Sequence, residues 1–104
     1  MATYIMFMKL TEEGASGIAD AKRGRDAGKK AAEALGVTWK RSYLVMDEYD
    51  VIVIVEAPDD ETMARYALLG QMSGAVNIKT VRAFTEREAD ELTGSLADFA
   101  GAVS

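Results

Sequence analysis

The chain has 104 residues, of which 49% are hydrophobic, and its formal net charge at pH 7 is −5. This length fits one domain spanning residues 1–104, and the negative charge argues against nucleic acid and anionic membrane surfaces as partners. The sequence contains no cysteine and no histidine. Disulfides, the usual zinc sites, and catalysis by Ser-His-Asp or Cys-His groups are therefore excluded.

The apolar N-terminal segment is typical of a strand rather than of a targeting signal. Residues 3–10 are rich in β-forming side chains and lead into the turn-like Thr11-Glu12-Glu13-Gly14. No basic leader or cleavage pattern is present, and no stretch is long enough to span a membrane. We therefore expect a cytoplasmic protein.

Alternating helical and strand patterns follow along the chain. A helix is predicted over residues 16–35, with Gly36 as its C-terminal stop. Strands are predicted over residues 37–46 and 49–57, with Asp47-Glu48 as the turn between them. The second helix begins at its N-cap Asp59 and ends near residue 72. Its predicted buried stripe is Met63, Ala64, Ala67 and Leu68.

The last two predicted elements are a strand over residues 76–84 and a third helix. Thr85 and Glu88 form a capping box that begins this helix. Its apolar face consists of Ala89, Leu92, Leu96 and Phe99. The order β-α-β-β-α-β plus a terminal helix predicts an α+β fold of the split βαβ type. Such a fold has a four-stranded antiparallel sheet with two helices on one face.

The strands are apolar on both of their faces, which points to self-association. Tyr4, Met6 and Met8 lie on one side of the first strand, and Ile5 and Phe7 lie on the other. Two helices cover only one face, so the second face predicts a homodimer, or a higher oligomer, with sheets packed face to face. The alternative is that the third helix folds back over the open face of its own sheet.

Three segments of the chain resemble the GYD-domain family. They are residues 48–60, the Tyr4-Ile5 strand leading into residues 10–14, and Val81-Arg82-Ala83-Phe84-Thr85. The Gly-Tyr-Asp triplet of the family stands here as Glu48-Tyr49-Asp50. The resemblance implies a ferredoxin-like fold of the dimeric α/β-barrel type. Relatives with this architecture include cofactor-independent monooxygenases, lactone isomerases, haem enzymes and regulatory ligand-binding domains, so the resemblance does not fix an activity.

The predicted hairpin brings charged and aromatic side chains onto one face. An Asp47-Glu48 turn places Tyr43 opposite Ile52, Arg41 opposite Ile54 and Trp39 opposite Glu56, with Asp50 on the same face. A one-residue bulge would move the members on the first of these strands to the other face. Arg82 is the other charged residue within a β-rich segment, and side-chain alternation does not determine on which face of the sheet it lies. The predicted ligand-binding residues are Trp39, Arg41, Tyr43, Asp50, Glu56 and Arg82.

Two interpretations of this set remain open. In a small-molecule site, Arg41 holds a carboxylate or phenolate, Trp39 and Tyr43 stack on a ring, and a desolvated Asp50 or Glu56 acts as a base. In a purely structural interface, Arg41 pairs with Glu56 or Asp50 of either subunit, and Trp39 covers an edge. Asp50 then accepts backbone N–H bonds near the turn, and Tyr49 packs under a helix.

The sequence therefore supports two functions. One is a small-molecule-binding domain, which would include a cofactor-independent enzyme, with its ligand in the cavity between subunits. The other is a non-enzymatic oligomerisation or regulatory module without a ligand. The acidic cluster Asp59-Asp60-Glu61 is interpreted as a helix start rather than as a metal site. No metal and no cofactor are expected, and the catalytic residues are not identified.

Overall fold

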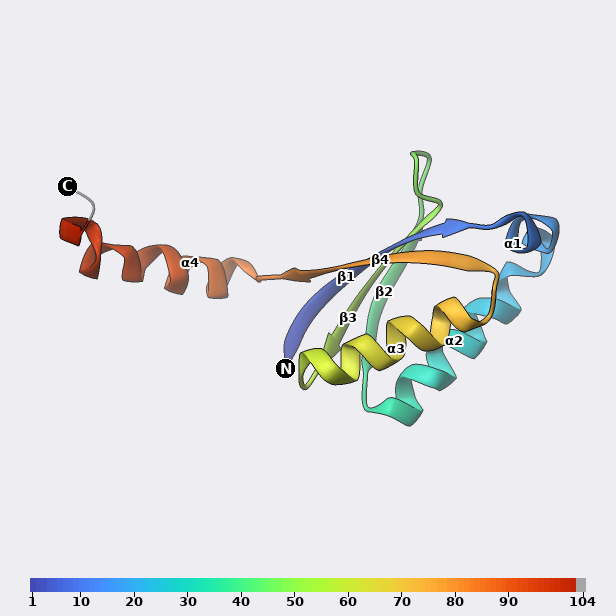
Figure 1. Ribbon diagram of the computed structural model, residues 1–104, viewed down its shortest axis with the longest axis horizontal. Helices are drawn as coiled ribbons and strands as arrows, with labels where there is room; N and C mark the ends of the chain where they lie inside the picture. Colours follow the sequence, from blue (N-terminus) through green and yellow to red (C-terminus); the bar gives the residue numbers. More distant parts are fainter. Residues whose placement is uncertain (103–104) are drawn as a thin grey trace.

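The computed structural model describes residues 1–102 and has the predicted split βαβ topology (Figure 1). The strands form one antiparallel sheet in the order β2-β3-β1-β4. No helix within residues 1–102 is long and apolar enough to cross a membrane. In chain order the elements are β1 (Ala2–Leu10), α1 (Glu12–Ser16), η1 (Ile18–Asp20), α2 (Ala21–Leu35), β2 (Thr38–Leu44), β3 (Val51–Ala57), α3 (Asp60–Met72), β4 (Val76–Ala83), α4 (Glu86–Ser95), η2 (Leu96–Asp98) and η3 (Ala100–Ala102).

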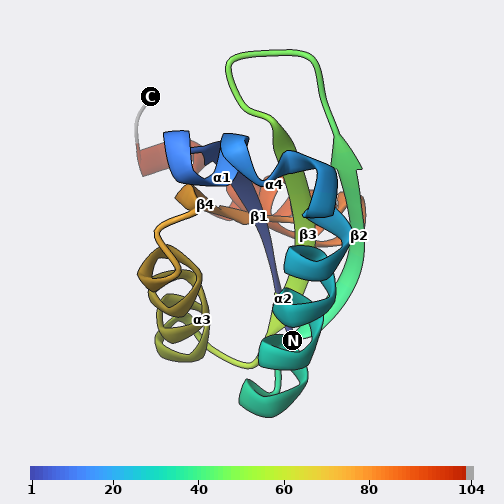
Figure 2. The same cartoon turned by 90° about the vertical axis from the view of Figure 1, so that its right-hand side faces the viewer.

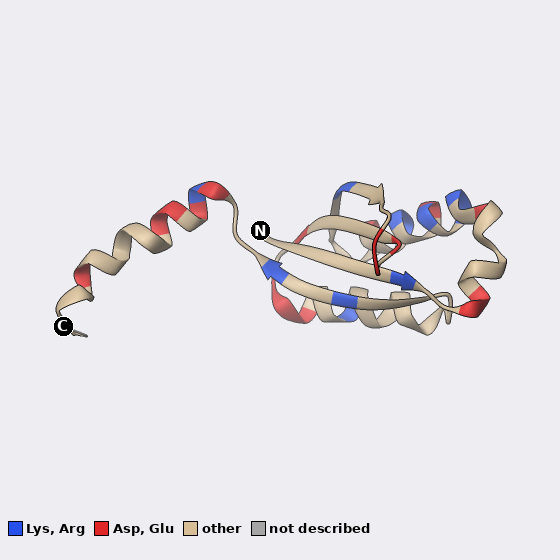
Figure 3. Cartoon of the chain, turned by 90° about the horizontal axis from the view of Figure 1, so that it is seen from above, with Lys and Arg blue, Asp and Glu red and all other residues tan. Residues whose placement is uncertain are grey.

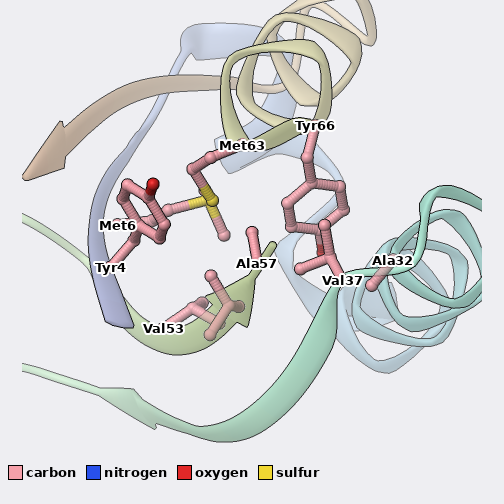
Figure 4. Packing of buried hydrophobic residues seen from close by; sticks show 9 residues of the cluster. Tyr4, Met6, Ala32, Val37, Val53, Ala57, Met63 and Tyr66 are labelled. Carbon is pink, nitrogen blue, oxygen red and sulfur yellow. The ribbon is translucent and has the colours of Figure 1, made fainter. Parts of the chain in front are cut away.

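The hydrophobic core lies between the sheet and helices α2 and α3, which share one side of the sheet (Figure 2). Met6 of β1, Val53 of β3 and Met63 of α3 are almost completely buried there (Figure 4). Tyr66 reaches across from α3 towards α2, where its hydroxyl donates to the Gly28 carbonyl at 2.8 Å. Burial raises the pKa of Tyr66 to about 12. This cross-helix contact joins the two helices of the layer.

The buried stripe of α3 differs from the prediction. Ala64 and Leu68 are exposed, while Tyr66 is buried beside Met63. Positions 63, 66, 67 and 70 follow the helical spacing i, i+3, i+4, i+7 and therefore share one face. The sequence prediction selected the face with Ala64 and Leu68 because its side chains are more apolar. In the structure the overlapping face with Tyr66 is buried, because the Tyr66 ring fills the space between α2 and α3 and its hydroxyl bonds to Gly28.

The segment after β1 is also more helical than predicted. Thr11-Glu12-Glu13-Gly14 is the capped start of α1, since the Thr11 hydroxyl accepts the Gly14 backbone N–H at 3.1 Å. The segment packs closely on the start of β4, where the Thr11 backbone N–H donates to the Ala75 carbonyl at 3.0 Å. A Cβ atom on Gly14 would lie only 2.0 Å from that carbonyl oxygen. Glycine is therefore required at this position by the close approach of two backbones.

The third predicted helix forms, but it does not fold back over the sheet. The capping box is present, with the Thr85 hydroxyl accepting the Glu88 N–H at 3.2 Å and the Glu88 carboxylate accepting the Thr85 N–H at 2.9 Å. Helix α4 and the turns after it point away from the domain (Figure 1). The helix ends at Ser95, and Leu96 lies in a separate 3-10 turn.

The close approach at Gly14 generates a prediction with a matched control. Gly14→Ala is expected to lower the free energy of unfolding by about 1–3 kcal/mol, because the new methyl group meets backbone that cannot rotate away. Gly24→Ala lies in α2 with nothing within 4 Å of the added Cβ, so it is expected to raise stability by up to about 1 kcal/mol. Urea denaturation followed by circular dichroism measures both. Equal effects of the two substitutions would show that the Gly14 contact carries no weight.

Candidate functional site

Within residues 1–102 no helix covers the side of the sheet opposite α2 and α3, and we call this side the open face. Figure 3 looks onto it. Alternation along the observed registers places apolar side chains of the central strands β1 and β3 at its middle. The open face consists of Thr3, Ile5, Phe7, Lys9, Thr38, Arg41, Tyr43, Ile52, Ile54, Glu56, Asn77, Lys79, Val81 and Ala83.

The β2–β3 hairpin confirms the predicted pairing in part. Tyr43 pairs with Ile52 and Arg41 pairs with Ile54, as the sequence predicts. The strands end at Leu44 and begin again at Val51, so the connection is a longer loop than the predicted Asp47-Glu48 turn. The loop remains closed at its base, where the Val45 N–H donates to the Asp50 carbonyl at 2.9 Å. It rises on the open-face side of the sheet (Figure 1).

Trp39 does not lie on the open face, and its predicted placement is wrong. The register shifts by one residue between Trp39 and Arg41, so Trp39 pairs with Val55 instead of Glu56. A bulge of this kind turns the residues on one side of it to the opposite face. Trp39 packs against the core from the edge of the sheet, with the Lys29 ammonium 5.7 Å from its ring centre. Its ring therefore belongs to the helix side of the molecule.

The ion pair of Arg41 with Glu56 or Asp50, which the structural interpretation places in one subunit or between two, does not form within a single chain. Glu56 is on the open face, but its carboxylate lies 3.7 Å from the ammonium of Lys40, the bulge residue. The exposed Arg41 guanidinium has no ion-pair partner among residues 1–102. Arg41 and Tyr43 thus share the edge of the open face, with a free positive charge beside a half-exposed ring.

Asp50 takes the structural role that the sequence left open. Its carboxylate accepts the Leu10 backbone N–H at 2.8 Å, and its own N–H donates to the Met8 carbonyl at 2.8 Å. The side chain thus extends the β1–β3 ladder beyond its last residue pair. Tyr49 was expected under a helix, but its ring lies against Phe7 with centres 5.3 Å apart. Phe7 belongs to the open face, so the prediction for Tyr49 is wrong.

Arg82 lies just before α4, on the opposite face of the sheet from Arg41, Tyr43 and Glu56. It pairs across the ladder with Tyr4, on the helix side of the sheet. Its guanidinium is 4.4 Å from the ring centre of Phe84, 3.7 Å from the Glu88 carboxylate, and 3.1 Å from the Thr3 carbonyl to which it donates. These contacts fix the path of the chain as it leaves β4.

The surroundings of Arg82 include two groups with shifted pKa values. The Tyr4 hydroxyl donates to Asp60 at the start of α3, and this hydrogen bond together with burial raises the pKa of Tyr4. The backbone N–H of Thr85 and the nearby Arg82 charge lower the pKa of Glu88. Both shifts come from contacts that hold α3 and α4 in place, which makes this a structural cluster.

The structure thus brings together three of the six predicted residues, Arg41, Tyr43 and Glu56. Two further cations share their face, Lys9 and Lys79, which sequence analysis did not select. Lys9 could have been predicted from the sequence, because side-chain alternation along β1 places it on the same face as Ile5 and Phe7. Lys79 required the β1–β4 register, in which it faces Phe7. An apolar surface bearing several cations is suited to contact an apolar surface with negative charge, or a small anion.

Within residues 1–102, no three acidic side chains are grouped so that they could hold a metal ion. The acidic residues before α3 serve the helix start instead, since the Asp59 carboxylate accepts the Thr62 N–H at 2.8 Å.

The role of Asp50 can be tested against its neighbour Glu48. Asp50→Ala leaves the Leu10 N–H without its acceptor and is expected to lower the free energy of unfolding by about 1–3 kcal/mol. Glu48→Ala removes the same charge from the same loop without removing a side-chain hydrogen bond, and it is expected to change stability by less than about 0.5 kcal/mol. Denaturant unfolding measures the difference. Equal midpoints for the two variants would contradict the role given to Asp50.

Comparisons with known proteins agree with the resemblance found in the sequence. A protein of Thermus thermophilus named "glutamine synthetase and cystathionine beta-lyase binding protein" is 31% identical over 84 residues, which are 80% of this chain and 88% of that protein. A solved structure from Thermus thermophilus superposes with a TM-score of 0.54 at 22% identity, covering 82% of this chain and 95% of the other. A hypothetical protein from Pyrococcus horikoshii superposes with a TM-score of 0.52 at 22% identity, covering 83% and 93%. These two structures show the fold alone. The sequence model of the GYD domain matches residues 4–93, and the chain therefore belongs to the GYD domain family.

Proposed function

We propose that the protein is a homodimeric binding protein whose two sheets pack against each other through their open faces. The observation that carries this proposal is the apolar middle of the open face, formed by Ile5, Phe7, Ile52 and Ile54. No helix of the described chain lies over it (Figure 3). Burying such a surface against a second copy is favoured by about 25 cal/mol for each Å² of apolar area removed from water.

A two-fold contact with an identical copy would cover the open faces of both chains at once. In a two-fold contact each residue meets the symmetry-related surface of the same patch, so a single apolar face is sufficient for both partners. The central strands supply the apolar side chains and the edge strands supply the cations Arg41 and Lys79. This arrangement of an apolar middle and a charged rim is the usual anatomy of a protein interface.

The assignment of a protein partner rests on the 31% identical relative, which is named for binding glutamine synthetase and cystathionine beta-lyase. We extend protein binding to this chain because the match covers 80% of it, which includes most of the folded domain. Of the two enzymes we take glutamine synthetase as the partner to test first.

The test is an isothermal titration of purified glutamine synthetase from the same host with the intact protein. We expect saturable binding with one protein dimer as the binding unit, since the dimer is the proposed functional form. An unrelated enzyme of the same host serves as the control and is expected to give no heat. If glutamine synthetase gives no heat of binding and does not co-elute with the protein, the proposed partner is wrong. The proposed dimer is tested separately, by measuring the molecular mass of the protein in solution.

A small molecule between the two sheets is a second candidate, favoured by the unpaired Arg41 beside Tyr43. If the site holds an anion, Arg41→Met should abolish retention of a co-purifying ligand in native mass spectrometry and change the unfolding midpoint little, because the charge is solvated. If Arg41 instead pairs with a carboxylate inside the interface, the same substitution should destabilise the dimer by about 3–5 kcal/mol. Tyr43→Phe keeps the ring and the charge pattern and is the matched control.

A further inference from the structure

The C-terminal arm, which we define as residues 85–102, extends away from the rest of the domain beyond its first turn (Figure 1). Helix α4 is followed by η2 and η3, and these elements pack mainly on each other, apart from the ion pair of Glu88 with Arg82 at the base of the arm (Figures 1 and 3). Leu92, Leu96 and Phe99 are 51%, 60% and 64% exposed. They recur at helical spacing along one side of the arm, forming an apolar stripe. A free helix of this length is only marginally stable in water.

The overall dimensions show how far the arm departs from a self-contained domain. The radius of gyration is 16.6 Å and the principal extents are 56 × 30 × 19 Å. A compact domain of this length would have a radius of about 13 Å. The arm begins at a fixed point, because Arg82 contacts Phe84 and Glu88 and the capping box orders its first turn. Its direction away from the domain is therefore set by specific contacts.

The charge of the arm is opposite to that of the open face. The arm has five carboxylates, Glu86, Glu88, Asp90, Glu91 and Asp98, and one cation, Arg87. Its net charge is therefore −4, whereas that of the whole chain is −5. On the open face, Lys9, Arg41 and Lys79 have no ion-pair partner among residues 1–102. The acidic arm with its apolar stripe is thus complementary in charge and polarity to the open face, whose cations lack ion-pair partners. The arm cannot reach the open face of its own chain in this structure, because it points away from it (Figure 1).

We propose that the C-terminal arm crosses to a second copy of the chain and packs its apolar stripe on the β2 edge of that copy's open face. The half-exposed ring of Tyr43 meets the stripe there, and Arg41 attracts the acidic residues beside it. The apolar middle of the face remains available for the sheet-to-sheet contact, so the arm exchange adds to the dimer and rests on it. The two symmetry-related arms would then hold the dimer together and cover the rim of the space between the sheets.

Hydrogen exchange of the intact protein, measured at concentrations above and below the dimer dissociation constant, tests the inference. In the dimer we expect the α4 amides to exchange at least about tenfold more slowly than unprotected amides, because a docked helix opens rarely. Dilution to the monomer should remove this protection. Leu96→Asp, which puts a charge on the stripe, should remove it at all concentrations. Gly94→Asp is the control, because it adds the same charge on the other side of the helix, about 200° around the axis from Leu92. Nothing lies within 4 Å of a Cβ atom at position 94, so this substitution should leave the protection of the α4 amides unchanged.

Each other outcome overturns a defined part of the account. A dimer with unprotected α4 amides would show that the arm is free in the assembly and would overturn the exchange alone. Protection that persists in the monomer would place the arm on its own domain and would also overturn it. A chain that is monomeric at every concentration would overturn the proposed dimer, and the arm exchange with it. Equal loss of protection in the Leu96 and Gly94 variants would show that the stripe is not the contact surface.

Discussion

Both faces of strands β1 and β3 carry apolar side chains, while α2 and α3 cover only one of them. On the covered face, Met6, Val53 and Val55 are buried and define the core of the domain. On the other face, Ile5, Phe7 and Ile54 remain partly exposed to water in the single chain. The hydrophobic effect opposes such exposure in proportion to the apolar area, so the fold is complete only when something covers the open face. The proposed dimer follows from this constraint, and the proposed arm exchange depends in turn on that dimer.

Much of the fold could be predicted from the sequence because its signals are local and periodic. The alternation in residues 3–10 and 51–55 determined which side chains share a face, and Gly36, Asp59 and the Thr85–Glu88 box marked helix ends that the structure confirms. The buried face of α3 was harder to predict, since Tyr66 is buried through its contact with Gly28 of another helix. No local pattern reports a partner that lies 38 residues away.

The candidate site was predicted less well because it depends on register. Arg41 and Tyr43 lie between the bulge and the loop, where the predicted pairs with Ile54 and Ile52 are observed, so the pairing of both residues was predicted correctly. Trp39 lies beyond a bulge at Lys40, and a single inserted residue reverses the face without leaving a pattern in the sequence. Asp50 was a candidate for either chemistry or structure. Its hydrogen bond to the Leu10 backbone shows why an acidic side chain is useful at the end of this hairpin, whatever residue stands at position 48.

The central claim is that the open face is the contact between two copies, and sedimentation equilibrium of the intact protein tests it most directly. The account predicts a mass twice that of the 11.2 kDa chain at micromolar concentration. It also predicts that Ile5→Glu, in the middle of the open face, shifts the protein towards the monomer. Leu68→Glu, on the exposed side of α3, should remain dimeric. A wild-type chain that sediments as a folded 11.2 kDa monomer, or an Ile5→Glu dimer as tight as the wild type, would contradict the account.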